Sequence, residues 1–326
     1  VSGAHSFYTV RILLGIVESG FFPGMILYMT YWFTKSYRAR LVALFMAANP
    51  LANIVGAPLS SVLLGLNGFW GLAGWQWLFL IEGLPAMLLA LVVLKLLPDK
   101  PGDVSWLNDD ERKTIAIALA KDDAAEHRDL WAALRDPRVY TLGVIYFGYS
   151  MAFYGVGLWM PQIVHGMGVS NLATGFVIAP CYLLAMIAMI YWGRSSDKRN
   201  ERVWHVAAPA LMMMASFLVA SITHSNLVTF SALTLVLVGS MALQGPFWVL
   251  PSTFLGGGAA AGGIALINTM GTAAGGFAGP YILGLFRQEN GDYAAGMAAL
   301  SVGPLLTAAL VLFLARGHAF AIRKSP

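Results

Sequence analysis

The sequence predicts an all-α protein that crosses a membrane many times. Of its 326 residues 58% are hydrophobic and only 11% are charged, and the mean hydropathy is +0.69. Soluble domains, by contrast, carry about 25% charged residues. The apolar residues fall into runs of about 20, the length that a helix needs to cross a bilayer. Because membrane-spanning strands need only about 10 residues, these runs indicate helices rather than a barrel.

Breaking the apolar runs at charges and at Gly/Pro clusters gives nine predicted membrane spans. They are residues 8–33, 41–64, 75–97, 139–164, 172–193, 205–223, 227–250, 261–286 and 294–315. The one long polar stretch separates three spans from six. We therefore expect three parts: residues 1–97 with three spans, the connection 98–136, and residues 137–326 with six spans.

The polar connection has the sequence pattern of short surface helices. Asn108 is followed at the third position by Glu111, a capping-box pattern that begins a helix. Residues 129–135 form a second short helical pattern, which ends before Pro137. The mixed charges of this stretch favour a solvated linker over a binding site.

The basic residues predict how the chain is oriented. All but two of the 20 Lys and Arg residues lie on one side of the membrane if the spans alternate. The exceptions are Arg11, inside the first span, and Arg287, on the opposite side. Since basic residues are retained on the cytoplasmic side, we expect a multi-pass protein of the inner membrane with a cytoplasmic C-terminus.

The composition also excludes several classes of function. A net charge of +4 is too small to indicate binding to nucleic acid. Cys181 is the only cysteine, so no disulfide forms within the chain, and the scattered histidines show no metal-ligand spacing. We expect no cofactor and no metal site. No span pairs a nucleophile with a base, which argues against an enzyme, the remote alternative. The sequence does not indicate an oligomeric state.

Two ionisable residues lie within the first predicted span. Arg11 and Glu18 are seven residues apart, which places them on nearly the same helix face with about 10 Å of rise between them. They are too far apart to pair as helix neighbours, so each needs another partner. Arg11 is either a clamp for a substrate carboxylate or an arginine that reaches the membrane surface. Glu18 is either a proton carrier or a protonated structural carboxyl.

The later spans offer polar candidates without charge. Gln162 and Asn268 are amides in apolar runs, where they need hydrogen-bonding partners, and Tyr154 lies in an aromatic stripe that otherwise favours packing. We expect these three side chains to line a substrate cavity. Glu82, beside Gly83, is favoured as a local hydrogen-bonding group at a helix bend.

The order of motifs resembles the anion:cation symporter family of the major facilitator superfamily. The segments that carry the resemblance are RILLGIVESGFFPG, YWF followed by YRAR, GWQWLFLIEGLP and YGVGLWMPQIV. Their closest likeness is to bacterial carriers of tartrate, phthalate or 4-hydroxyphenylacetate. The resemblance implies the major facilitator fold of twelve spans in two halves. We therefore expect that about three helices precede this chain, which by itself would not transport.

The resemblance also implies a function and roles for the two charged residues. It implies symport of a small organic anion, a carboxylate, with a proton by alternating access. In galactonate and vesicular glutamate carriers the corresponding arginine contacts the anion, and the glutamate of the galactonate symporter is implicated in proton coupling. These roles fall on Arg11 and Glu18. The alternative is a drug/proton antiporter, although Gly56 and Pro58 do not have the spacing of that group's motif.

A further motif resembles the superfamily's G-x-x-x-D-[RK]-x-x-R signature. It runs from Gly193 through Asp197 and Arg199 to Arg202. An aspartate with arginines at a helix end can form a breakable charge network, which suits a cytoplasmic gate. The alternative is ordinary basicity on the cytoplasmic side.

Overall fold

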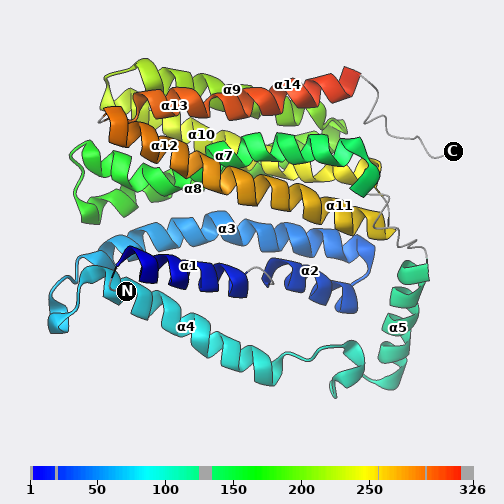
Figure 1. The fold of residues 1–326 in the computed structure, drawn as a ribbon. Helices are drawn as coiled ribbons and strands as arrows, with labels where there is room; N and C mark the ends of the chain where they lie inside the picture. Colours follow the sequence, from blue (N-terminus) through cyan, green and yellow to red (C-terminus); the bar gives the residue numbers. More distant parts are fainter. Residues whose placement is uncertain (1–2, 19–20, 125–133, 256, 291, 317–326) are drawn as a thin grey trace. The chain divides into compact units, whose positions relative to one another are not determined.

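A computed structural model describes residues 3–18, 21–124, 134–255, 257–290 and 292–316, and this part of the chain is helical without a strand (Figure 1). Its α-helices are α1 (Ala4–Glu18), α2 (Phe21–Trp32), α3 (Lys35–Leu64), α4 (Gly74–Leu96), α5 (Asp109–Ala124), α7 (Pro137–Gly166), α8 (Asn171–Arg199), α9 (Val203–Ile222), α10 (Asn226–Val249), α11 (Gly257–Thr269), α12 (Gly276–Asn290), α13 (Ala294–Leu300) and α14 (Val302–Arg316). Three short 3-10 turns are η1 (Phe69–Gly71), η2 (Pro101–Asp103) and η3 (Pro251–Thr253), and η4 (Met270–Gly275) is a π-helix.

Seven helices among the described residues are long and apolar enough to cross a membrane. They are Leu44–Leu64, Gly74–Leu96, Pro137–Gly166, Asn171–Arg199, Val203–Ile222, Asn226–Val249 and Ala294–Arg316. Each corresponds to a predicted span. The fold class predicted from the sequence, an all-α polytopic membrane protein, is therefore confirmed.

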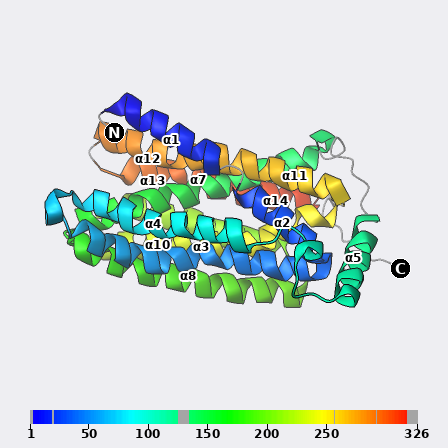
Figure 2. The same cartoon turned by 90° about the horizontal axis from the view of Figure 1, so that it is seen from below.

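Two predicted spans are not among these seven. Residues 8–33 fall on α1 and α2, and residues 19–20 between those helices lie outside the described part of the chain; Pro23 lies within the first turn of α2, where proline is tolerated. Residues 261–286 fall on α11, η4 and α12, which continue along one line (Figure 2). Here the helical run is unbroken but changes to π-helical hydrogen bonding in its middle.

The chain divides into two compact units. The first is Val1–Ala47 with Leu84–Glu126, and the second is Ala48–Gly83 with His127–Pro326. The predicted division at residues 97 and 137 concerns the halves of a transporter and stays a prediction.

In the first unit, the start of the polar connection packs on α2. The Trp32 and Trp106 rings stack with centroids 6.0 Å apart, and the Tyr28 hydroxyl donates to the Pro98 carbonyl oxygen at 3.1 Å. The capping box forms as predicted: the Glu111 amide donates to Asn108 Oδ1 at 2.8 Å, and the Asn108 amide donates to a Glu111 carboxylate oxygen at 2.9 Å. The predicted helix 129–135 lies largely outside the described residues.

The second unit is a bundle in which α7 packs against α8, α10, α11, α12, α13 and α14. Helix α7 begins with a regular N-terminal cap: Asp136 accepts a hydrogen bond from the Arg138 amide at 2.8 Å, and Pro137 occupies the first helical position. The Arg138 guanidinium, hydrogen-bonded to Asp136, holds the pKa of that carboxyl below its usual value.

Small residues let the backbones of α7 and its neighbours approach closely. A Cβ added to Gly148 would collide with the Gly303 carbonyl oxygen on α14, and one added to Gly279 on α12 would collide with the Met151 carbonyl oxygen. Thr307 donates its hydroxyl to the Ile145 carbonyl oxygen at 2.8 Å. Such contacts favour association in a bilayer, where lipid tails are as apolar as the helix surfaces.

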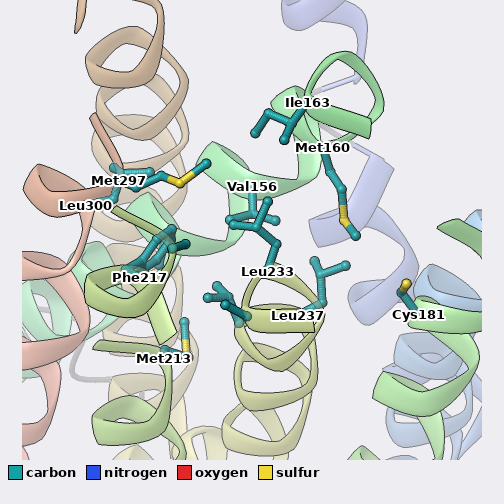
Figure 3. Packing of buried hydrophobic residues seen from close by; sticks show 14 of the residues in the cluster. Val156, Met160, Ile163, Cys181, Met213, Phe217, Leu233, Leu237, Met297 and Leu300 are labelled. Atoms are coloured by element: carbon teal, nitrogen blue, oxygen red, sulfur yellow. The ribbon is translucent and has the colours of Figure 1, made fainter. Parts of the chain in front are cut away.

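Buried side chains from α7, α8, α9, α10, α12 and α13 form the main apolar cluster of this unit (Figure 3). Phe217, Met213, Val156 and Leu237 within it are fully buried. Because this cluster joins helices distant in the sequence, it fixes the bundle that positions the polar residues described below.

We predict that Phe217→Ala lowers the free energy of unfolding by about 3 kcal/mol, because it leaves a cavity that the bundle cannot fill. Phe313→Ala is the matched control, since Phe313 on α14 is 70% exposed and makes few such contacts. Thermal unfolding of both variants in detergent measures the difference. Equal losses would contradict the assignment of the core.

Candidate functional site

Tyrosine and serine hydroxyls gather in the middle of α7. Tyr146 and Tyr149 stack with ring centroids 5.2 Å apart, and Phe153 continues the stack beside Tyr154. From α10, Phe247 packs parallel to Tyr146 at 5.1 Å. The rings of this stripe therefore pack, as the sequence favours; Tyr146 and Tyr149 are buried with their hydroxyl groups, whereas Tyr154 is 38% exposed.

The π-helix η4 faces these hydroxyls. A Cβ at Gly271 would overlap the Tyr146 ring, and one at Gly275 would lie 2.8 Å from Ser150 Cβ, so both positions require glycine for this close approach. π-helical turns inside α-helices occur frequently at functional sites. Among the described residues, η4 is the one such turn.

An amide and a hydroxyl extend from this helical run toward α7. The Thr272 hydroxyl donates to Asn268 Oδ1 at 3.2 Å. Thr272 also lies beside the phenols of Tyr146 and Tyr154. We call the set Tyr146, Tyr149, Ser150, Tyr154, Asn268 and Thr272 the α7–η4 cluster. Within it, the structure brings together Tyr154 and Asn268, two of the three polar residues proposed from the sequence.

Two hydroxyls of the α7–η4 cluster have no hydrogen-bond partner in the described part of the chain. They are Tyr149 Oη and Ser150 Oγ, and both atoms are buried. A buried hydroxyl without a partner costs about 1–3 kcal/mol. A buried water molecule or a polar ligand that supplies the missing hydrogen bonds is therefore favoured at this point.

Gln162 lies apart from the α7–η4 cluster. It is exposed, and its Cα is eight residues beyond Tyr154 on α7, about 12 Å along the helix. Nearby, Trp159 Nε1 donates to the Pro280 carbonyl oxygen at 3.0 Å and fixes α7 to α12. The proposed contact of Gln162 with substrate stays a prediction.

Arg11 and Glu18 both lie on α1, in the first unit. The Arg11 guanidinium sits over the Phe7 ring, 5.3 Å from its centroid, and both Arg11 and Glu18 are exposed. The two residues therefore share one helix, as predicted, and do not pair with each other. Their roles toward substrate and proton stay predictions.

Glu82 has a partner on a neighbouring helix. The Ser60 hydroxyl of α3 donates to Glu82 Oε1 of α4 at 2.7 Å. The bond joins two spans, whereas the sequence favoured a local role at a bend within one helix. Pro85 lies inside α4, which continues past it.

At the α8–α9 corner, the predicted gate residues form part of a network. Arg202 Nη1 lies 2.7 Å from Asp197 Oδ1 and also donates to Ser196 Oγ at 2.7 Å. Arg199 is exposed and forms no ion pair in the described part of the chain, and a Cβ at Gly193 would meet no neighbour. The structure thus joins Asp197 and Arg202 of the four predicted residues.

A buried histidine with hydrogen-bond partners on both ring nitrogens lies at the same corner and was not predicted from the sequence. His205 is buried, with Nδ1 2.6 Å from a Glu201 carboxylate oxygen and Nε2 3.1 Å from Ser195 Oγ. Glu201 and His205 are four residues apart, a spacing that brings side chains together on a helix and from which their contact could have been predicted. Ser195 lies on another helix, and only the fold brings it close.

Three comparisons place this architecture among known proteins. The sequence pattern of the Major Facilitator Superfamily matches residues 1–280. A protein of Agrobacterium vitis named "Putative tartrate transporter" is 42% identical over 97% of this chain and 73% of its own length. A quinolone resistance transporter of Acinetobacter baumannii is 36% identical over 93% of this chain and 70% of its own length.

A solved structure shares the fold. It is the inward-facing, occupied form of a bacterial homolog to the human lysosomal transporter Spinster, and it superposes with a TM-score of 0.69 at 17% identity. The match covers 95% of this chain and 76% of that one. At this identity the likeness concerns the fold alone.

We predict that Gly271→Ala lowers stability by about 2 kcal/mol, because the new methyl group would displace the Tyr146 ring. Gly56→Ala is the control: an added Cβ there meets no neighbour, and alanine favours a helix by up to about 1 kcal/mol. Thermal unfolding in detergent measures both. A Gly271→Ala protein as stable as Gly56→Ala would contradict the close contact.

Proposed function

This chain belongs to the Major Facilitator Superfamily and is a membrane transporter, and on that premise we propose that it imports a small organic anion together with a proton. The observation that carries the proposal is the α7–η4 cluster, with two buried hydroxyls that lack a partner among the described residues. Hydroxyl and amide groups suit a carboxylate that itself bears hydroxyl groups. The name of the Agrobacterium vitis relative supports tartrate as the first substrate to test.

The charge distribution supports an anion rather than a cation. Residues 138–196 and 203–288 contain no Asp or Glu, so the later spans offer a cationic substrate no counter-charge. Arg11 is the one arginine within a predicted span, and Lys95 lies only at the end of span 75–97. The planar guanidinium of Arg11 can bind a carboxylate through two hydrogen bonds. We assign the substrate carboxylate to Arg11, and the substrate hydroxyls to Gln162, Asn268 and Tyr154.

Proton coupling is assigned to Glu18. A carboxyl group in a low-dielectric span binds a proton readily and releases it when a cation approaches or water enters. Glu18 can therefore load and unload a proton as the transporter alternates between its two faces. The protein would lie in the inner membrane with its C-terminus in the cytoplasm, the orientation that the basic residues favour.

The Asp197–Arg202 pair is assigned to the cytoplasmic gate. The Asp197 side chain is 70% exposed, so water can solvate it when the helices rearrange, while Arg202, whose side chain is 16% exposed, keeps its hydrogen bond to Ser196 Oγ. Gly193 and Arg199 complete the motif from which the gate was proposed. Opening and closing of this corner would accompany alternating access.

Export of a drug in exchange for protons is the second candidate. The Acinetobacter baumannii relative, named for quinolone resistance, supports it. Against it stands the spacing of Gly56 and Pro58, which departs from the antiporter motif. Accumulation of tartrate inside cells, set against expulsion of a fluorescent quinolone, separates the two functions.

We predict that substitutions of Arg11 and Glu18, made in the intact transporter that carries this segment, fail differently in proteoliposomes. Arg11→Lys keeps the charge but loses the planar fork, so tartrate binding and uptake should both weaken by about 1–3 kcal/mol. Glu18→Gln mimics the protonated acid, so exchange of labelled tartrate at equal pH should continue while accumulation driven by a pH gradient stops.

The matched controls for these variants are Arg316→Lys and Glu82→Gln. Arg316 lies at the end of α14, and Glu82 is an acid within a span that is already bonded to Ser60. Both controls should accumulate tartrate. Accumulation by Glu18→Gln against a gradient would refute its coupling role, and normal uptake by Arg11→Lys would place the anion elsewhere.

We predict that Tyr149→Phe has opposite effects on stability and on binding. Removing an unpartnered buried hydroxyl should leave the substrate-free protein as stable as the original or about 1 kcal/mol more stable. If that hydroxyl binds substrate, tartrate affinity should fall about tenfold. Thermal shifts with and without tartrate measure both quantities, and an unchanged shift would exclude Tyr149 from the site.

A further inference from the structure

A hollow lies between α8, α9 and α10, near the α8–α9 corner and apart from the α7–η4 cluster. Its volume is about 500 Å³, within the range of small-molecule sites. Nine residues, which we call the α8–α10 groove, line it: Ala188, Tyr191, Trp192, Ser195, Ala208, Pro209, Met212, Val238 and Ala242.

The hollow arises from small side chains opposite large ones. Ala188, Ala208 and Ala242 come from three different helices and leave space that no neighbour fills. Trp192 forms a fixed wall, because its Nε1 donates to the His205 carbonyl oxygen at 2.8 Å and its ring packs on the imidazole. Tyr191 is 69% exposed, so the groove lies at the outer face of the bundle.

The lining is almost entirely apolar and therefore suits a hydrocarbon chain. Its one aliphatic hydroxyl, Ser195 Oγ, already interacts with His205. A hydrophilic solute would find few free donors or acceptors there. The groove also lies along membrane-spanning helices, where the surrounding solvent is lipid.

Two cations lie on α8 next to the groove. Lys198 follows Ser195 by three positions and lies about one turn beyond it, and Arg194 follows Tyr191 by three positions and lies at the flank of the groove, at the level of Ser195. Both are exposed, and neither forms an ion pair in the described part of the chain, whereas Arg202 of the same corner is paired. An apolar groove that leads to two available cations matches the chemistry of an anionic lipid.

We propose that the α8–α10 groove binds one acyl chain of an anionic glycerophospholipid, with its phosphate group on Arg194 and Lys198. The guanidinium and the ammonium bind phosphate oxygens through charge-assisted hydrogen bonds. Basic pockets between spans on the cytoplasmic side are suited to lipid headgroups, and the predicted orientation places this corner there. The bound lipid would fasten α8, α9 and α10 at the corner that holds the proposed gate.

Quenching of Trp192 by brominated lipid tests the proposal. The protein is placed in nanodiscs of phosphatidylcholine, and a rising fraction of phosphatidylglycerol with brominated acyl chains is added. Subtracting the signal of Trp192→Phe isolates the quenching of Trp192. It should saturate at a low fraction of brominated phosphatidylglycerol, and brominated phosphatidylcholine should need a far higher one.

Two pairs of variants distinguish the site for the acyl chain from the site for the lipid headgroup. Ala208→Phe fills the groove and should abolish saturable quenching, while Ala215→Phe, at an exposed alanine of α9 outside the groove, should not. Arg194→Gln and Lys198→Gln should each raise the half-saturating fraction about fivefold. Arg316→Gln is the control for the charge change.

Native mass spectrometry gives a second measurement that does not rest on fluorescence. The original protein should retain one phosphatidylglycerol after detergent exchange, and Ala208→Phe, or Ala188→Phe if the former does not fold, should retain none. Equal quenching by both brominated lipids would overturn the choice of an anionic lipid. Protection of Trp192 from both lipids in a dimer would overturn the groove as a lipid site.

Discussion

Close backbone contact around α7 is the constraint on which the second unit depends. In a bilayer the hydrophobic effect does little to join helices, so association relies on packing and on hydrogen bonds between helices. Gly148 against Gly303 and Gly279 against Met151 bring α14 and α12 to α7 at distances that no larger residue would permit. The bond from Thr307 to the Ile145 carbonyl oxygen adds a polar contact to the same seam.

The same close contact creates the unusual features of the candidate site. Where Gly271 and Gly275 approach Tyr146 and Ser150, the helix that carries them adopts π-helical hydrogen bonding. In the described part of the chain, Tyr149 Oη is buried without a hydrogen-bond partner. The π-helical turn and the buried hydroxyl without a hydrogen-bond partner thus occur at the same level of the bundle. Such coincidence is expected where stability is traded for function.

The α8–α9 corner combines three kinds of interaction in a short stretch of chain. An ion pair joins the exposed Asp197 to the largely buried Arg202, a buried imidazole bridges Glu201 and Ser195, and an apolar groove begins beside Ser195. Water reaches the ion pair at Asp197, whereas the imidazole is shielded from water, and we propose that the groove binds lipid. A corner built in this way can be rearranged without unfolding either helix.

The sequence by itself determined the fold class, seven of the spans and the capping box at Asn108, because these depend on local properties: apolar length, helix-cap chemistry and the spacing of charges. It also indicated Tyr154 and Asn268, because polar groups in apolar runs stand out in any sequence. Only the tertiary structure decided that Tyr149 Oη lacks a partner, that η4 is π-helical, and that Ser195 meets His205. Those features arise from contacts between helices far apart in the chain, and no local pattern specifies which backbone will approach which side chain.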